Sequence, residues 1–160
     1  MAFAPTVKTA QSLAIAVPAL LLGGAYVSEL IFGLYPCEMC WWQRWPHFAA
    51  LAFALSSIAT PFRRMMTGLA AVAILASGAI GGFHAGVEYG WWDGITSCAI
   101  IAAAAGGNAL ESVMNAPMVR CDAAPWDLFG ISLAGWNCVI STGSAIAISV
   151  ILMKPDVSRV

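Results

Sequence analysis

Five cysteines offer the clearest chemistry in this sequence. Cys37 and Cys40 form a C-x-x-C motif, Cys98 and Cys121 are widely spaced further along the chain, and Cys138 stands alone. A bridge within C-x-x-C closes a ring too small to tie distant segments together. Its usual use is redox exchange, because one thiol can attack a mixed disulfide that its neighbour has formed. The motif therefore indicates thiol–disulfide chemistry.

A zinc site is the competing interpretation of these cysteines. A structural zinc site takes four Cys or His ligands, and the widely spaced Cys98 and Cys121 bring no second motif. We therefore expect no metal. A structural clasp is the lesser alternative for the second pair, because the glycines and prolines around it predict an accessible loop where labile disulfides occur. These residues are Gly94, Gly106, Gly107, Pro117 and Pro125. Cys138 is expected to behave as a small apolar residue.

Three charged or titratable residues could assist the C-x-x-C motif. Cys40 is expected just before a helix, with Arg44 one turn further on, and both the helix dipole and the guanidinium favour a thiolate. Taken alone, Arg44 is as well explained as an anchor at the membrane surface. His84 and Glu88 are four residues apart and so share one face of a helix. A lone interfacial histidine is more often structural, unless a polar head group lies at its level.

The composition indicates the environment in which these residues work. Apolar residues make up 61% of the 160 residues, and Asp, Glu, Lys and Arg only 9%. A soluble domain carries about 25% charged residues, because its surface faces water. Lipid is therefore the expected solvent, and disorder, nucleic-acid binding and an ordinary cytosolic enzyme are excluded.

Four long uncharged runs predict an all-α membrane protein. A helix needs about 20 such residues to cross a bilayer, and lipid requires every backbone amide to be bonded internally. We expect a single integral membrane domain over residues 1–160, a four-transmembrane-helix bundle with a long extracytoplasmic loop between its third and fourth helices. The spans are expected at about 10–30, 44–62, 65–87 and 130–153, and the outer loops at about 31–43 and 88–129. A fifth uncharged run, Gly94–Leu110, is expected to be a surface or interfacial segment.

Basic residues predict the orientation of the bundle. Five of the seven fall on one side, which should be the cytoplasm. These five are Lys8, Arg63, Arg64, Lys154 and Arg159. Both termini are then cytoplasmic, and the first span is expected to be retained as a helix. The four paired cysteines face the oxidising side of the membrane.

Taken together, these features resemble the DsbB family of membrane thiol–quinone oxidoreductases. The matching residues are Pro36-Cys37-Glu38-Met39-Cys40 with Arg44, His84-Ala85-Gly86-Val87-Glu88, Cys98, Cys121-Asp122, and the run from Trp126 to Asn137. The sequence is similar over most of its length, and the combination is far more specific than a lone C-x-x-C. It departs from the best-known members in a shorter distance between the loop cysteines and in the extra Cys138.

The resemblance implies an activity and a role for each site residue. Such a protein lies in the bacterial inner membrane, reoxidises a periplasmic DsbA-like dithiol protein of the thioredoxin fold, and passes the electrons to ubiquinone or menaquinone. By position, Cys98 would receive the partner's thiolate, with Cys121 as its loop partner. Cys37 and Cys40 would then accept the electrons, with Cys40 against the quinone. Arg44, His84 and Glu88 would hold the quinone.

Two other interpretations remain open at this point. An enzyme of the vitamin K epoxide reductase type is also a quinone-linked four-helix protein, but its C-x-x-C is expected near the last helix rather than after the first. A non-catalytic membrane scaffold or assembly subunit with structural disulfides would have no need of Arg44 beside the C-x-x-C.

Overall fold

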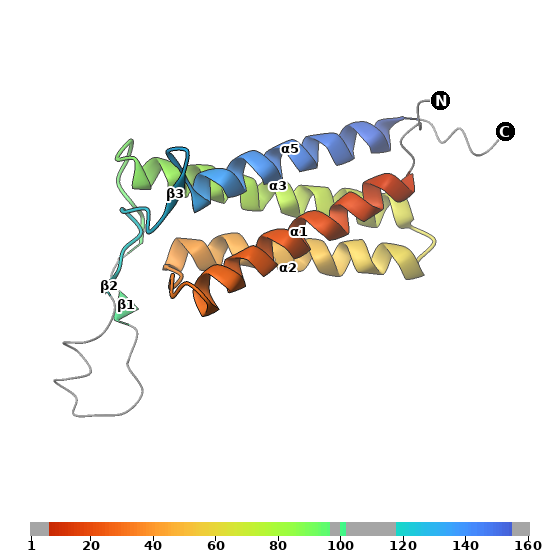
Figure 1. The fold of residues 1–160 in the computed structure, drawn as a ribbon. Helices are drawn as coiled ribbons and strands as arrows, with labels where there is room; N and C mark the ends of the chain where they lie inside the picture. Colours follow the sequence, from red (N-terminus) through yellow and green to blue (C-terminus); the bar gives the residue numbers. More distant parts are fainter. Residues whose placement is uncertain (1–6, 97–99, 102–117, 155–160) are drawn as a thin grey trace.

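The computed structural model describes residues 7–96, 100–101 and 118–154, and within them it is a bundle of four helices (Figure 1). The helices are α1 (Val7–Leu30), α2 (Glu38–Ala59), α3 (Arg63–Glu88) and α5 (Leu133–Met153). Two short antiparallel pairs lie beyond the ends of α3 and α5. They are β1 (Ile100–Ile101) with β2 (Met118–Val119), and β3 (Asp127–Leu128) with β4 (Ile131–Ser132). Cys98 and much of the run Gly94–Leu110 lie outside the described residues.

The expectation of a helical membrane protein is confirmed in its main feature. Three helices, α1, α3 and α5, are long and apolar enough to cross a membrane. The fourth, α2, is of similar length but carries Gln43, Arg44 and His47 among its apolar residues, and it does not meet that measure. It packs against α1 and α3, and α5 packs against α1 and α3. All four helices therefore belong to one bundle.

Two helix starts differ from the sequence expectation, each because of a capping residue. Helix α2 begins at Glu38, not near residue 44, and the Cys37 sulfur accepts a hydrogen bond from the Cys40 backbone amide at 3.3 Å. Cys40 thus lies in the first turn of α2 instead of before the helix. Helix α5 begins at Leu133, because the β3–β4 hairpin occupies residues 127–132 and the Ser132 hydroxyl caps the helix through the Gly135 amide.

The bundle is held together by small residues and is covered by large ones. Its core cluster is Ala10, Ala14, Ala50, Ala54, Ala70, Ala71, Ile74, Ala145 and Ile148. Alanines at helix interfaces let backbones approach closely, as in membrane bundles. Large apolar side chains such as Leu55, Ile58 and Val72 are instead exposed on the outside. That distribution suits a lipid surface, where outward apolar side chains carry no penalty.

Gly81 in α3 occupies a point of close approach beside the polar centre of the bundle. A Cβ there would lie 2.9 Å from both the Ala134 carbonyl oxygen and the Asn137 amide nitrogen, and 3.1 Å from the Gln43 amide oxygen. Gly68, in the same helix, has no atom within 4 Å of its corresponding position. The two glycines therefore form a matched pair, one enclosed and one open.

We expect Gly81→Ala to destabilise the protein and Gly68→Ala to leave it unchanged or slightly more stable. The added methyl group at position 81 must push backbone or amide groups away, whereas alanine at an open helical position is favoured over glycine by about 0.5–1 kcal/mol. Thermal unfolding in detergent, followed by circular dichroism, measures both. Equal midpoints for the two variants would contradict the close approach at Gly81.

Candidate active site

Three of the four candidate redox cysteines lie together at one end of the bundle. The Sγ atoms of Cys37 and Cys40 are 2.9 Å apart, and the Cys37 thiol donates to Cys40. The Cys121 Sγ, the Cys37 Sγ and the His84 Nε2 all lie within 4.8 Å of one another. Cys37 and Cys121 are buried in one cluster with Met39 and Val87. The Cys121 sulfur, from the segment between α3 and α5, thus lies next to the C-x-x-C motif.

The two thiols of the motif are not equivalent. The hydrogen bond that Cys37 donates to Cys40 raises the pKa of Cys37, and burial raises it further. The same hydrogen bond lowers the pKa of Cys40, with a smaller contribution from the Arg44 guanidinium. Both residues precede the uncharged run at 45–62. Cys40 is therefore the more acidic thiol of the pair, and the main cause of its lowered pKa is the neighbouring Cys37 thiol and not Arg44.

At pH 7 we expect a small alkylating reagent to modify Cys40 in the reduced protein about tenfold faster than Cys37, because only the thiolate reacts. A lowered pKa keeps Cys40 reactive as the pH falls below about 8.5, the ordinary thiol value, whereas the raised pKa keeps Cys37 protonated. Cys37→Ala removes the donor and should slow Cys40. Mass spectrometry of peptides after timed labelling measures both rates; faster labelling of Cys37 would reverse the assignment.

Arg44 is buried in a fixed position. Its Nη1 lies 2.6 Å from the Glu29 Oε2, and its guanidinium lies 4.8 Å from the ring centres of both Tyr26 and Trp41. Only 6% of the residue is exposed. A membrane-surface anchor would extend toward water, whereas this arginine joins α1 to α2 through a paired charge and two aromatic faces. Glu29, the first charged residue after the first uncharged run, is the sequence signal that could have indicated its partner.

His84 and Glu88 share a face of α3, as their spacing predicts. The His84 Nε2 lies 3.6 Å from the Cys37 Sγ and 3.7 Å from the Glu88 Oε1. The backbone of Cys121 is a further hydrogen-bond partner of the His84 ring. The other Glu88 oxygen, Oε2, is buried without a hydrogen-bond partner among the described residues. His84 thus contacts the thiol cluster directly, and Glu88 lies behind it.

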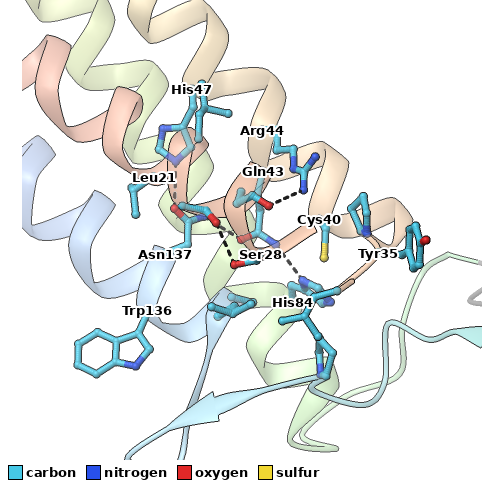
Figure 2. A pocket seen from close by; sticks show the side chains of 18 of the residues that line it. Leu21, Ser28, Tyr35, Cys40, Gln43, Arg44, His47, His84, Trp136 and Asn137 are labelled. Atoms are coloured by element: carbon cyan, nitrogen blue, oxygen red, sulfur yellow. Dashed lines mark hydrogen bonds between the residues drawn. The ribbon is translucent and has the colours of Figure 1, made fainter. Parts of the chain in front are cut away.

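Gln43 and Asn137 connect His84 to the centre of the bundle (Figure 2). The Gln43 Nε2 donates to the Met39 carbonyl at 3.3 Å and lies 2.8 Å from the His84 Nδ1. The Asn137 Nδ2 donates to the Gln43 Oε1 at 2.8 Å and to the Ser77 carbonyl at 3.2 Å. Because a backbone carbonyl can only accept, these bonds determine which end of each amide is nitrogen. The His84 Nδ1 must then accept, so that in the neutral ring Nε2 carries the hydrogen.

This hydrogen-bond chain also tests the metal interpretation. Cys37, His84 and Cys121 have the residue types and proximity of a metal site. A metal at Nε2 would need the lone pair there, with the hydrogen on Nδ1 donated to an acceptor. Gln43 presents a donor to Nδ1 instead. The arrangement therefore suits an N–H at Nε2, near the Cys37 sulfur and the Cys121 backbone, better than a metal ion.

A cavity of about 250 Å³ opens beside the thiols, between α1, α2 and α5 (Figure 2). Its apolar lining includes Leu20, Leu21, Leu22, Leu34, Leu133 and Trp136. Its polar lining includes the three candidate ligand-binding residues named from the sequence, Arg44, His84 and Glu88, together with Cys40. It also includes three residues that the sequence analysis missed, Gln43, His47 and Asn137. A polar residue within an apolar membrane helix is itself a functional signal, which could have indicated these three.

Comparison with known proteins identifies the family. The sequence model described as "Disulfide bond formation protein DsbB" matches residues 7–151. The chain belongs to the DsbB family. The DsbB resemblance of the sequence is thereby confirmed, and membership indicates a membrane protein with a role in disulfide bond formation. Another similar protein is the uncharacterized protein RP370 of Rickettsia prowazekii (strain Madrid E), 23% identical over 157 residues, which cover 95% of this chain and 91% of that one. No solved structure matches the chain.

Proposed function

We propose that this protein is a protein-disulfide:quinone oxidoreductase that reoxidises a DsbA-like dithiol protein and passes the electron pair to a membrane quinone. The observation that carries the proposal is the contiguity of three sulfurs and a cavity. The Cys121 sulfur lies within 4.8 Å of that of Cys37, Cys37 lies 2.9 Å from Cys40, and Cys40 lines the cavity. An electron pair can thus move by thiol–disulfide exchange from an outer segment to a lipid-side pocket, with no metal or flavin.

Each step of the proposed relay exchanges one disulfide for another. The partner's thiolate attacks a Cys98–Cys121 disulfide at Cys98, releasing the Cys121 thiolate. Cys121 attacks the Cys37–Cys40 disulfide at Cys37 and releases Cys40. The partner's second thiolate then resolves the mixed disulfide, which oxidises the partner and frees Cys98. Cys98 attacks Cys121, restoring the loop disulfide and leaving Cys37 and Cys40 reduced. Two electrons and two protons have then passed from the partner to the C-x-x-C pair.

The residues around the cavity fit a quinone head group. The cavity walls are mostly apolar, and the side chains of Cys40, Arg44, His47 and Glu88 add polar atoms to the lining. A bound quinone supplies a two-electron, two-proton acceptor. Here Arg44 would hold a quinone oxygen and keep Cys40 ionised. His84 would direct its Nε2 hydrogen at the Cys37 sulfur, stabilising the charge that develops there during exchange.

In the same proposal all four helices cross the inner membrane, with both termini in the cytoplasm. Helix α2 can span despite its polar residues, because Gln43 and His47 are bonded inside the bundle and Arg44 is paired. The cysteines of the site then lie on the periplasmic side, where a soluble thioredoxin-fold partner can reach Cys98. The basic residues Arg63 and Arg64 at the start of α3 lie at the opposite end of the bundle (Figure 1).

The purified chain, mixed with a reduced DsbA-like protein and a short-chain ubiquinone, should bleach the quinone absorbance in proportion to partner oxidised. Cys40→Ser should abolish this, and Arg44→Gln should raise the KM for quinone about tenfold or more, since it removes a charged hydrogen bond. Cys138→Ser is the control that should leave turnover unchanged. Unchanged thiols on quinone addition would instead support a scaffold with structural disulfides.

The order of the relay predicts which cysteine can be trapped with the partner. Replacing Cys121 by Ser removes the loop partner that competes for Cys98, so a covalent complex through Cys98 should accumulate. Non-reducing electrophoresis with a partner that lacks its own resolving cysteine measures the complex. The matched control is Cys98→Ser, which should form none. A complex carried by Cys37 or Cys40 alone would contradict the proposed order.

A further inference from the structure

His47 presents an unused nitrogen in the candidate active site. The residue is 3% exposed and lines the cavity, one turn of α2 beyond Gln43 (Figure 2). Its Nε2 lies 3.0 Å from the Asn137 Oδ1. Its Nδ1 is buried and has no hydrogen-bond partner within the described part of the chain. Buried polar atoms are nearly always hydrogen-bonded, and the cavity that His47 lines is where a further partner for this side chain can bind.

The surrounding bonds determine what kind of partner Nδ1 can take. The Asn137 amide nitrogen donates to the Ser77 carbonyl, which can only accept, so the oxygen of the same amide faces His47. The Ser141 hydroxyl donates to that oxygen as well. His47 must therefore donate through Nε2, and in the neutral ring Nδ1 carries a lone pair without a hydrogen. It can accept a hydrogen bond but cannot donate one.

We propose that His47 is a ligand-binding residue that accepts a hydrogen bond from a phenolic hydroxyl, and so recognises the hydroquinone in preference to the quinone. The inference rests on the proposed function for its choice of ligand. A quinone offers only carbonyl oxygens, which cannot bond to a lone pair, whereas a hydroquinone offers O–H donors. Arg44, about one turn before His47 in the same helix, also lines the cavity, and its guanidinium donates and can bind either form. The two residues therefore differ in the redox form they favour.

Selective binding of the reduced form has a thermodynamic consequence for the reaction. A site that binds hydroquinone more tightly than quinone shifts the equilibrium of the bound pair toward the reduced form. The bound quinone thus becomes a stronger oxidant of the Cys37–Cys40 pair than it is in free lipid. His47 would contribute to driving thiol oxidation without contacting a sulfur.

Binding measurements on the reduced full-length chain in detergent test this without turnover. The probes are pentylhydroquinone and its dimethyl ether, which share a ring and tail but differ in the hydroxyl hydrogens. We expect His47→Leu to weaken binding of the hydroquinone about tenfold, the effect of losing one hydrogen bond, and to leave binding of the ether unchanged. Ser56→Ala is the control, because that hydroxyl lies in the same helix as His47, bonds to the Ala52 carbonyl and is not part of the cavity lining. It should alter neither affinity.

The chain contains only two histidines, which makes a direct spectroscopic test possible even where His47→Leu folds poorly. In protein labelled with ¹⁵N-histidine, both Nδ1 resonances should be of the unprotonated type. Pentylhydroquinone should shift the His47 Nδ1 resonance, and the dimethyl ether should not. A protonated His47 Nδ1 in the neutral ring, no shift with hydroquinone, or the same shift with both probes would overturn the inference.

These outcomes separate the inference from the proposed function. A hydroquinone-specific shift in a chain that fails to oxidise the DsbA-like partner would uphold the inference and refute the proposed activity. Normal turnover with equal effects of His47→Leu on both probes would do the reverse. If the wild-type chain binds neither probe, the assignment of the cavity to quinone is wrong, and the inference fails with it.

Discussion

The Gln43 side chain is the contact on which the geometry of the site depends. Its amide nitrogen bonds to the Met39 carbonyl and the His84 ring, and its oxygen accepts from Asn137. One residue of α2 thereby connects α3 to α5 and determines which nitrogen of His84 carries the hydrogen directed at Cys37. Both hydrogens of this amide are bonded and its oxygen accepts one bond, which matters in an apolar bundle because an unsatisfied amide would be costly. The need to satisfy this amide therefore fixes the orientation of the His84 ring beside the Cys37 sulfur.

The polar centre lies inside the bundle and is separated from the surrounding lipid by the helices and their outer apolar side chains. Alanine and glycine bring the helices close, so that short polar side chains such as Ser77 can bridge them. Large apolar side chains point outward. Arg44 is likewise kept from the outer surface, because its charge is paired with Glu29 and its guanidinium packs against the rings of Tyr26 and Trp41. The Arg44 charge is therefore compensated inside the bundle, away from its apolar outer surface.

Sequence reasoning reached the local features of this protein and missed those that depend on tertiary contacts. Hydropathy and charge spacing were sufficient to predict helices near 10–30 and 65–87, because lipid imposes its requirement on each segment separately. The C-x-x-C motif and the shared face of His84 and Glu88 are likewise local. The sequence predicts too late a start for α2. Its N-cap is a cysteine, which is not a common capping residue, and Glu38 in its first turn lies outside the uncharged run.

The partners of the site residues required the three-dimensional structure. Nothing in the spacing of Gln43 and Asn137 indicates that they bond, since 94 residues separate them. Glu29 was visible only as the end of an uncharged run, and its pairing with Arg44 depends on how α1 crosses α2. The same applies to Cys121, whose approach to Cys37 depends on the path of the chain after α3. Pairwise contacts of this kind leave no periodic signal in a single sequence.

The distribution of polar partners among the helices bears on how the protein is made. Helix α2 is less apolar than its neighbours, and two of the groups that bond to its buried side chains come from Asn137 in α5, which follows α2 in the chain only after α3. Until α5 has been synthesised, the Gln43 oxygen and the His47 Nε2 lack those partners and must bond to water or to other polar groups. The polar side chains of α2 therefore find their final partners only when α5 joins the bundle, and the site is assembled in that same step.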